Sequence, residues 1–389
     1  MKKYAIFSRV LSGVLTGALA LSLTACGADN NAAPSADAAE DTGVTHLRLA
    51  YHGSLCGAPL YVGIEKGFFA EENLEIEQVT VDAAHVSEAI GADQVDVGMG
   101  LIGKFLQPLE NGLPAKFTTG IHTGCIKLLV PADSDIASVS DLKGKNIGVP
   151  GLADAGTIVT KRSLDSAGIG VTDDNMEVTF TVFSRNDLPQ ALENKAVDAI
   201  VLGDPQASIA EEQYGLTPLI DTATDDAYKD EYCCAAFVTT KLAEENPEAA
   251  AAFTRAVQKA SQWVQDNPDE AAQLITEKNY VSGDADFNAS VLKAYNYKPS
   301  VQGGYDALKL IVEQLSKIGV LKQDTDAAAF ADSAYVFLDG VSDASAGSTA
   351  QAAPATSALT FQPADSAASS EDDCCGGGAA PAPSPAPKA

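Results

Sequence analysis

Histidine and cysteine occur at short, repeated spacings in this chain. One segment reads His52-x-x-x-Cys56, another reads His122-x-x-Cys125, and an adjacent pair, Cys233-Cys234, follows later. If these segments converge, their imidazole and thiolate groups would suit zinc, Cu(I) or an iron species. A disulfide such as Cys56 to Cys125, or thiols packed as small apolar groups, are the other interpretations that stay open. The candidate metal ligands are His52, Cys56, His122, Cys125, Cys233 and Cys234.

Hydroxyl and glycine residues accompany these side chains at the predicted ends of strands. Hydroxyl groups can donate hydrogen bonds to a polar solute, and glycine lets backbone N–H groups approach an oxyanion closely. We therefore expect these loops to line one ligand site. The candidate ligand-binding residues are His52, Ser54, Cys56, Gly100, Leu101, His122, Thr123, Gly124, Cys125, Asp154, Ala155, Gly156, Thr157, Asp204 and Cys233.

Two carboxylates in these loops allow two interpretations. Facing a ligand, Asp154 and Asp204 would attract an ammonium or a ring N–H and would repel a sulfonate. Alternatively, each could cap a helix, and Asp204 stands directly before Pro205 at an expected helix start. The ligand class therefore stays open between anions and nitrogen-containing solutes.

Alternating patterns predict the elements that must position these residues. Residues 46–51 and 74–81 read as strands around a helix over 58–66, so the chain opens with a βαβ unit. Strands and helices alternate to about Val238, and helices then dominate. Asn246-Pro247 and Asn267-Pro268 each mark a helix start, with the asparagine as a candidate cap. The fold class that follows is α/β.

One internal similarity indicates two lobes built to the same plan. Residues 88–96, EAIGADQVD, align without gaps on residues 190–198, QALENKAVD. Each reads as the end of a helix followed by a strand. In parallel α/β sheets, ligands bind at the carboxyl ends of strands, so two such sheets facing one another would enclose a cleft.

The chain resembles a known family in four segments that occur in a fixed order. They are residues 58–74, 95–98, 129–134 and 139–149. They are similar to the nitrate, sulfonate and taurine group of ABC-transporter substrate-binding proteins, which includes a thiamine-pyrimidine-synthase-like branch. The resemblance implies a type II periplasmic-binding-protein fold. Lobe one would comprise residues 44–131 and 234–340, lobe two residues 132–233, and a hinge would join them.

The same resemblance implies a function without catalysis. A small polar solute, sulfonate-, taurine- or nitrate-like or pyrimidine-like, would be captured between the lobes and delivered to an ABC permease. A solute that contacts both lobes favours the closed state by its differential affinity. No resident cofactor is expected, a soft metal being the exception that the cysteines leave open. The protein is expected to be a monomer.

The pyrimidine-synthesising branch supplies a rival interpretation as an enzyme. It would use pyridoxal phosphate bound through a lysine, for which Lys104, Lys127 and Lys161 are the candidates. Cys233-Cys234 continues as Ala235-Ala236-Phe237, so only two positions match that branch's cysteine-rich stretch. No arrangement typical of a hydrolase or a nucleotide-binding loop is present in the sequence.

The N-terminus has the pattern of a lipoprotein signal. Three basic residues precede an apolar run over 10–23, which ends in Leu23-Thr24-Ala25-Cys26. This run of about 14 residues is shorter than the ~20 needed to span a bilayer. We expect a signal peptide over 1–25, a lipid on Cys26 and a flexible tether over 26–43. The protein would be exported and anchored to the outer face of the cell membrane.

Charge and the C-terminal composition limit the partners. The net charge of −28 disfavours nucleic acid and anionic lipid surfaces. Residues 341–389 are rich in Ala, Ser, Pro and Gly, which predicts a disordered tail. The tail contains the pair Cys374-Cys375, either a second metal site or an accident of a low-complexity segment.

Overall fold

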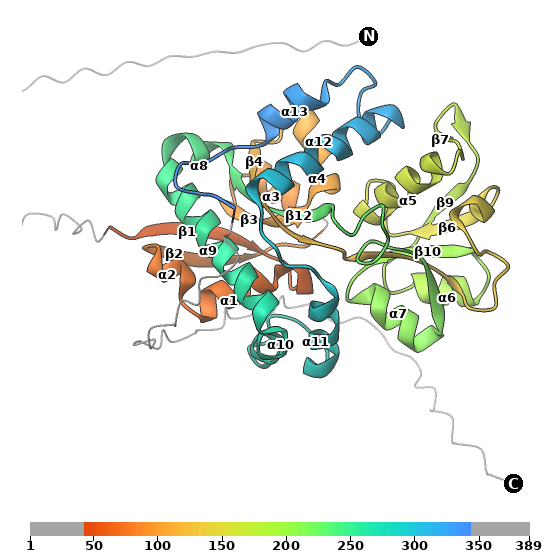
Figure 1. The fold of residues 1–389 in the computed structure, drawn as a ribbon, viewed down its shortest axis with the longest axis horizontal. Coiled ribbons are helices and arrows are strands. Elements are labelled where there is room, and N and C mark those ends of the chain that lie inside the picture. The colour runs from red at the N-terminus through yellow and green to blue at the C-terminus, as the bar shows by residue number, and fades with distance from the viewer. Residues whose placement is uncertain (1–42, 84, 344–389) are drawn as a thin grey trace, which may run out of the picture. The chain divides into compact units, whose positions relative to one another are not determined.

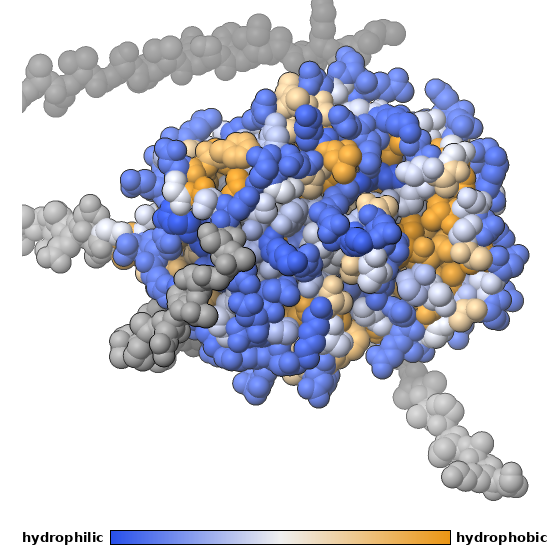
Figure 2. Space-filling view, in the orientation of Figure 1, coloured by the Kyte–Doolittle hydropathy of each residue, from blue (hydrophilic) through white to orange (hydrophobic). Residues whose placement is uncertain are grey.

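The computed structural model describes residues 43–83 and 85–343. The predicted signal peptide, lipidated Cys26, nearly all of the tether, and residues 344–389 with Cys374-Cys375 lie outside the described residues. Within the part that is described, no helix is both long and apolar enough to cross a membrane. Figure 2 shows hydrophilic side chains over most of the visible face, in keeping with the acidic composition.

The first five-stranded sheet has the order β2-β1-β3-β12-β4. Strand β1 runs parallel to β2 and β3, whereas β12 runs antiparallel to β3 and β4. The predicted opening βαβ unit is confirmed within one residue at each end. The strands are β1 (Thr45–Tyr51), β2 (Leu74–Thr80), β3 (Val97–Leu101), β4 (Ala115–Thr123) and β12 (Tyr232–Thr239).

The second five-stranded sheet repeats this plan with the order β9-β6-β10-β5-β11. Here β6 runs parallel to β9 and β10, and β5 runs antiparallel to β10 and β11. The strands are β5 (Ile126–Pro131), β6 (Asn146–Val149), β9 (Thr179–Val182), β10 (Ala199–Gly203) and β11 (Leu216–Asp221), with a separate hairpin of β7 (Val171–Thr172) and β8 (Asn175–Met176).

The internal similarity seen in the sequence has a structural counterpart in both sheets. Asp96, just before β3, accepts a hydrogen bond from the backbone N–H of Arg48 at 2.9 Å. Asp198, just before β10, accepts one from the backbone N–H of Asn146 at 2.7 Å. Each carboxylate thereby ties a strand to its parallel neighbour, which confirms two sheets built on one pattern.

Helices cover both sheets, as Figure 1 shows. Helix α5 lies on one side of the second sheet and α6 and α7 on the other, while α9 packs against α1 and α2 beside the first. The helices are α1 (Ala58–Glu65), α2 (Phe68–Glu71), α3 (Val86–Gly91), α4 (Ile102–Glu110), α5 (Ala155–Ser166), α6 (Leu188–Glu193), α7 (Gln206–Tyr214), α8 (Thr240–Glu245), α9 (Pro247–Asp266), α10 (Pro268–Glu277), α11 (Ala285–Ala294), α12 (Val301–Lys317) and α13 (Ala327–Ala334).

Of the two asparagines expected to cap helices, one does so. The side chain of Asn246 accepts from the N–H of Ala249 at 3.1 Å and caps α9. The side chain of Asn267 instead donates to the carbonyl of Trp263, the last turn of α9. Both prolines occupy the first helical position as predicted, because a missing N–H costs nothing there.

Two connections join the sheets and lie against each other. The first runs from β4 to β5 through Gly124 and Cys125, so the chain enters the second sheet before residue 131, where the sequence placed the boundary. The second runs from β11 to β12. The hydroxyl of Thr222 accepts hydrogen bonds from the backbone N–H groups of Cys125 and Ile126 at 3.1 and 3.0 Å. This hydroxyl therefore links the two connections by hydrogen bonds.

Candidate site at the junction of the two sheets

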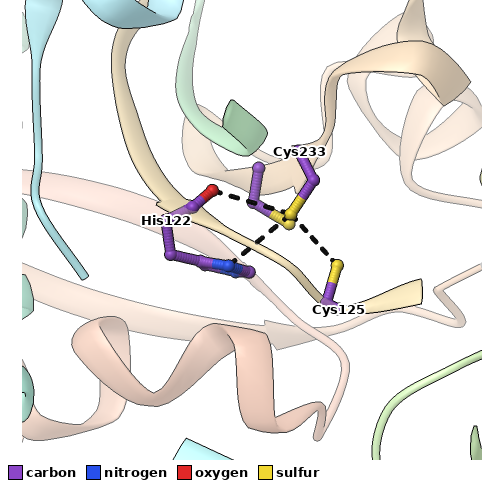
Figure 3. Close-up of side chains that lie close together, drawn as sticks. His122, Cys125 and Cys233 are labelled. Atoms are coloured by element: carbon purple, nitrogen blue, oxygen red, sulfur yellow. Dashed lines mark hydrogen bonds between the residues drawn. The ribbon is translucent and has the colours of Figure 1, made fainter. Parts of the chain in front are cut away.

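Four of the predicted metal ligands meet at this junction. One ligand atom from each of His122, Cys125, Cys233 and Cys234 lies within 4.8 Å of the others, and we call these four residues the junction cluster. His122 is the penultimate residue of β4, Cys125 follows Gly124, and the adjacent cysteines are the second and third residues of β12. Figure 3 shows the side chains of His122, Cys125 and Cys233 converging.

The register of β12 explains how two consecutive cysteines reach one site. Successive residues of a regular strand point to opposite faces of a sheet. Here the pairing of β12 with β4 shifts between Tyr232 and Cys234, and shifts again after Cys234, which pairs with His122. Such an irregularity re-aims side chains, so both thiols can face the same group.

Short contacts connect the junction cluster. The Sγ of Cys233 lies 3.1 Å from the Sγ of Cys125 and 3.6 Å from the Nδ1 of His122. All four cysteines of the described residues are free thiols. The Sγ of Cys56 contacts the Oη of Tyr295 at 3.8 Å. The thiol of Cys56 also interacts with the thiols of Cys125 and Cys234, although it is not one of the four donors of the junction cluster.

Two tyrosines hold the imidazole of His122. The ring of Tyr295 stacks on it with centroids 4.9 Å apart, and the ring of Tyr297 lies tilted at 5.0 Å. The hydroxyl of Tyr297 donates to the carbonyl of Leu55 at 3.1 Å. Neither tyrosine was among the predicted site residues, although the spacing Tyr295-Asn-Tyr297 directly after α11 is an aromatic signal visible in the sequence.

Ionisation within the junction cluster is uneven. Burial opposes the ionisation of Cys233, but hydrogen bonds from Cys125 and Cys234 prevail and lower the pKa of the Cys233 thiol. The hydrogen bond to Cys233 raises the pKa of Cys125, and hydrogen bonds to Cys125 and Cys233 raise that of Cys234. Negative charge therefore concentrates on one sulfur, towards which the other thiols donate.

The structure leaves His52 and Cys56 outside the junction cluster. His52 follows β1, and burial lowers the pKa of its imidazole, which keeps the ring neutral. The Nδ1 of His52 and the Oγ of Ser54 are buried and have no hydrogen-bond partner. Both atoms lie at the carboxyl end of β1, where ligands of α/β folds bind.

Buried polar atoms without a partner concentrate in the loops predicted from the sequence. Among the described residues six side chains have such an atom, and four of the six belong to predicted ligand loops. Native proteins leave few buried polar groups unpaired, so each needs a reason. The four atoms are His52 Nδ1, Ser54 Oγ, His122 Nε2 and Thr123 Oγ1.

In the predicted loop at the start of α5, the polar side chains form hydrogen bonds with nearby backbone groups. Asp154 caps the helix, accepting from the N–H of Gly156 at 3.0 Å, and pairs with Arg185. Thr157, expected to donate to a ligand, donates to the carbonyl of Gly151 at 2.7 Å. A Cβ on Gly156 would press on the side chain of Val201. Thr157 and Gly156 therefore serve the structure of this loop and not, as expected from the sequence, the ligand. The capping interpretation of Asp154 is confirmed.

Two further glycines have packing roles. Gly100 and Leu101 belong to β3 rather than to a loop, and a Cβ on Gly100 would collide with the ring of Phe105. Gly124 has φ of +70°, and a Cβ there would collide with Ala223 of the other connection. Close approach of the two connections, rather than space for an oxyanion, requires the glycine at 124.

Two other features near these loops are a cavity and the candidate lysines. A cavity of about 380 Å³ lies between α4 and α5 and borders Lys104 and Lys161, but none of the predicted ligand residues lines it. Lys127 forms ion pairs with Glu211 at 2.6 Å and Asp221 at 3.9 Å. An ion-paired lysine is a poor amine for binding an aldehyde cofactor.

Asp204 is buried and acts on the backbone of α7. Its Oδ1 accepts from both the N–H and the hydroxyl of Ser208, at 2.9 and 2.8 Å, and so satisfies an N–H of the first turn of α7, whose N-cap position is Pro205. Burial raises the pKa of its carboxyl to about 6. At neutral pH the folded protein therefore holds a charge that the environment disfavours.

We expect Asp204→Asn to stabilise the protein at neutral pH. The carboxyl pKa of about 6 in the folded state exceeds the ~3.9 of an unfolded chain, so ionisation costs stability above pH 6 and the cost vanishes towards pH 4. Asparagine retains an acceptor for Ser208. The free energy of unfolding should rise by on the order of 1–3 kcal/mol at pH 7.5 and hardly at pH 4. Chemical denaturation at both pH values measures this, and an equal gain at each would contradict it.

Comparisons with known proteins agree with this architecture. The sequence profile of a family described as NMT1/THI5 like matches residues 57–271, more than half of the chain. The chain belongs to this family. A Bacillus subtilis protein assigned as an aliphatic sulfonates-binding protein is 26% identical over 59% of this chain and 69% of its own length. The nitrate/nitrite binding protein NrtA of Synechococcus elongatus is 26% identical over 75% of this chain and 72% of its own.

Solved structures show the same fold for this NMT1/THI5-like chain. The periplasmic aliphatic sulphonate binding protein SsuA of Escherichia coli superposes with a TM-score of 0.62. The sequences are 16% identical, and the match covers 82% of this chain and 99% of SsuA. The expected periplasmic-binding-protein fold is therefore confirmed.

Proposed function

We propose that this protein captures a small polar solute outside the cytoplasm and delivers it to an ABC permease, without catalysis. The anchor would be a lipid on Cys26. Support comes from the family and from relatives whose names denote sulfonate and nitrate binding. The observation that carries the proposal is the set of four unpartnered polar atoms at the ends of β1 and β4.

The chemistry of these atoms favours a ligand held by hydrogen bonds. His52 is kept neutral by burial, and Ser54 and Thr123 offer hydroxyl groups. The carboxylate of Asp154 is balanced by Arg185, which reduces the repulsion of an anion. We therefore propose a sulfonate-, taurine- or nitrate-like anion or a pyrimidine-like ring as the solute class.

Capture would couple to movement at the junction. A solute held by residues of β1 and β4 lies beside the connections that join the sheets, where a small change reorients one sheet against the other. Its differential affinity for the closed state sets how far the equilibrium shifts. A permease could then discriminate loaded from empty protein by shape.

Thermal-shift screening tests the proposed solute class. Taurine, alkanesulfonates, nitrate and pyrimidines should be compared at concentrations far above the expected Kd, because a ligand at 100 times its Kd stabilises by ~2.7 kcal/mol. We expect a raised melting temperature with members of one class. The absence of a shift with every compound would refute the solute class. Calorimetry then gives the affinity of the compound that binds.

We expect Thr123→Val to stabilise the empty protein and to weaken solute binding. Valine has the shape of threonine but no hydroxyl, so it removes a buried polar atom that lacks a partner. The free energy of unfolding should rise by about 1 kcal/mol, and solute affinity should fall about tenfold for one lost hydrogen bond. Denaturation and calorimetry measure the two effects.

A matched control is available in α12. Ser316 also carries a buried hydroxyl without a partner, but it lies outside the predicted ligand loops. Ser316→Ala should stabilise the protein in the same way and leave solute affinity unchanged. If Thr123→Val left affinity unchanged too, the unpartnered atom of Thr123 would not be a ligand contact.

A further inference from the structure

The four donors of the junction cluster come from two strands of the first sheet and from one connection between the sheets. His122 lies in β4, Cys125 lies in the passage from β4 to β5, and Cys233 and Cys234 are the second and third residues of β12. Segments more than 100 residues apart in sequence therefore place three sulfurs and one imidazole around one point. An ion bound there would link the first connection to β4 and β12.

The spacing suits a tetrahedral ion. Ligands at ~2.05 Å for nitrogen and ~2.3 Å for sulfur around zinc imply an N···S separation of about 3.6 Å. The Nδ1 of His122 lies 3.6 Å from the Sγ of Cys233. The two sulfurs of Cys125 and Cys233 are 3.1 Å apart and would need to open by about 0.7 Å to reach the ~3.8 Å of a tetrahedral pair. Side-chain rotation alone can supply such a movement.

The imidazole distinguishes a metal site from the other two interpretations. His122 is 0% exposed, and its Nδ1 lies 3.6 Å from the Sγ of Cys233 and 3.3 Å from the carbonyl oxygen of Thr123. Packing of thiols as apolar groups gives no reason to bury a histidine among them. A disulfide between Cys125 and Cys233 would consume two sulfurs and leave His122 and Cys234 unexplained. A metal ion uses all four donors at once.

We propose that His122, Cys125, Cys233 and Cys234 bind one thiophilic, tetrahedral d¹⁰ ion, Zn²⁺ or Cu⁺. Thiolates and imidazole suit both ions, since soft sulfur ligands select them over Mg²⁺ or Ca²⁺. The thiols release their protons to solvent on binding, and the histidine binds as the neutral imidazole. The ion cross-links β4, the first connection and β12, so its binding adds to the stability of the folded protein. His122 would bind the ion through its Nδ1, so its Nε2 would stay available to the solute.

Metal binding should be measured on the full chain with Cys26→Ser, Cys374→Ser and Cys375→Ser. These substitutions leave Cys56 and the three cysteines of the junction cluster as the thiols of the protein. Zn²⁺ is titrated in competition with a chromophoric chelator, and Cu⁺ under anaerobic, reducing conditions. Co²⁺ serves as a spectroscopic probe of thiolate ligands. We expect one ion per chain, a higher melting temperature with that ion, and its reversal by chelator.

Single substitutions assign the ligands. Cys125→Ser and His122→Gln should each abolish stoichiometric binding, while His52→Gln, which changes a histidine outside the junction cluster, should retain it. Cys233→Ser provides a variant at a half-buried position should the buried substitutions fail to fold. Circular dichroism without metal verifies folding. Absence of binding by both ions, or unchanged binding in Cys233→Ser, would overturn the proposal.

Loss of metal binding and failure of the proposed function are distinguishable. Solute shifts are measured in the presence of chelator, and metal titrations in the absence of solute. A Cys125 to Cys233 disulfide that persists after mild reduction and excludes Zn²⁺ would replace the metal site with a redox pair, and would leave solute binding as proposed.

Discussion

Arg162→Leu should destabilise the protein by about 3–5 kcal/mol. The guanidinium of Arg162 in α5 donates to both carboxylate oxygens of Glu231, at 2.7 and 2.6 Å, and also to Gln314 of α12. The two charged side chains are 4% and 10% exposed. Removing the arginine leaves a buried carboxylate without its partner, and that uncompensated charge causes most of the loss. Chemical denaturation measures the free energy of unfolding.

Two controls separate this effect from ordinary loss of charge. The double variant Arg162→Leu with Glu231→Leu should recover most of the stability, because replacing a whole buried pair is often nearly neutral. Lys317→Ala breaks the ion pair between Lys317 and Asp165, in which the lysine side chain is 67% exposed. This substitution should lower the free energy of unfolding by no more than about 1 kcal/mol. A loss in Arg162→Leu as small as that in Lys317→Ala would contradict the prediction.

The ion pair also bears on the proposed closure. Arg162 belongs to the second sheet's helix α5, whereas Gln314 belongs to α12, which packs on β4 of the first sheet. Glu231 directly precedes β12. The guanidinium therefore links elements that would move relative to one another. Solute affinity of the double variant would report whether this link favours the closed state.

Gly304→Ala should destabilise the protein by about 3 kcal/mol, the upper end of the range for overpacking. A Cβ at this position would lie 2.9 Å from the Cα of Gly120 in β4 and 2.8 Å from the Oη of Tyr335, and closer still to the backbone nitrogen of Gly120. Backbone atoms cannot rotate away as a flexible side chain can. The helix α12 and the strand β4 must therefore separate, and thermal or chemical denaturation will show the loss.

The matched control is the same substitution in another helix. Gly103 in α4 has Ile158 as its nearest neighbour, with 3.5 Å between the new Cβ and the Cγ2 of Ile158, an ordinary contact. Gly103→Ala should be neutral or should stabilise by up to about 1 kcal/mol, because alanine restricts the unfolded chain. Gly304→Ala should also perturb the junction cluster, since Gly120 precedes His122 by two residues in β4. Equal stability of the two variants would show that the close approach of α12 and β4 is not limiting.

Much of the fold could be predicted because its signals are local. Residues 46–51, 58–66 and 74–81 showed strand, helix and strand within a few residues of the observed ends, since apolar periodicity repeats over one element. The similarity of residues 88–96 to 190–198 predicted two related sheets correctly. The lobe boundary differed, because assigning β5 to the second sheet depends on its pairing with β10 and β11.

The candidate site was predicted in part. The segments around His52 and His122 contain four unpartnered buried atoms, although His122 and Thr123 are the last two residues of β4 rather than part of a loop. Thr157 and Gly100 were assigned to the ligand but serve the α5 loop and the packing of Phe105. A local pattern shows which groups are available for chemistry, whereas their use depends on neighbours that are distant in sequence.

The sequence alone determined the family and the two-part α/β plan, because the patterns that indicate both lie within short segments of the chain, of about ten to twenty residues. It also identified histidine and cysteine as the unusual chemistry. Only the tertiary structure decided which of them meet. His122, Cys125, Cys233 and Cys234 converge, and His52 stays apart, because irregular pairing of β12 with β4 turns adjacent cysteines towards one point. That register is a property of two strands far apart in the chain.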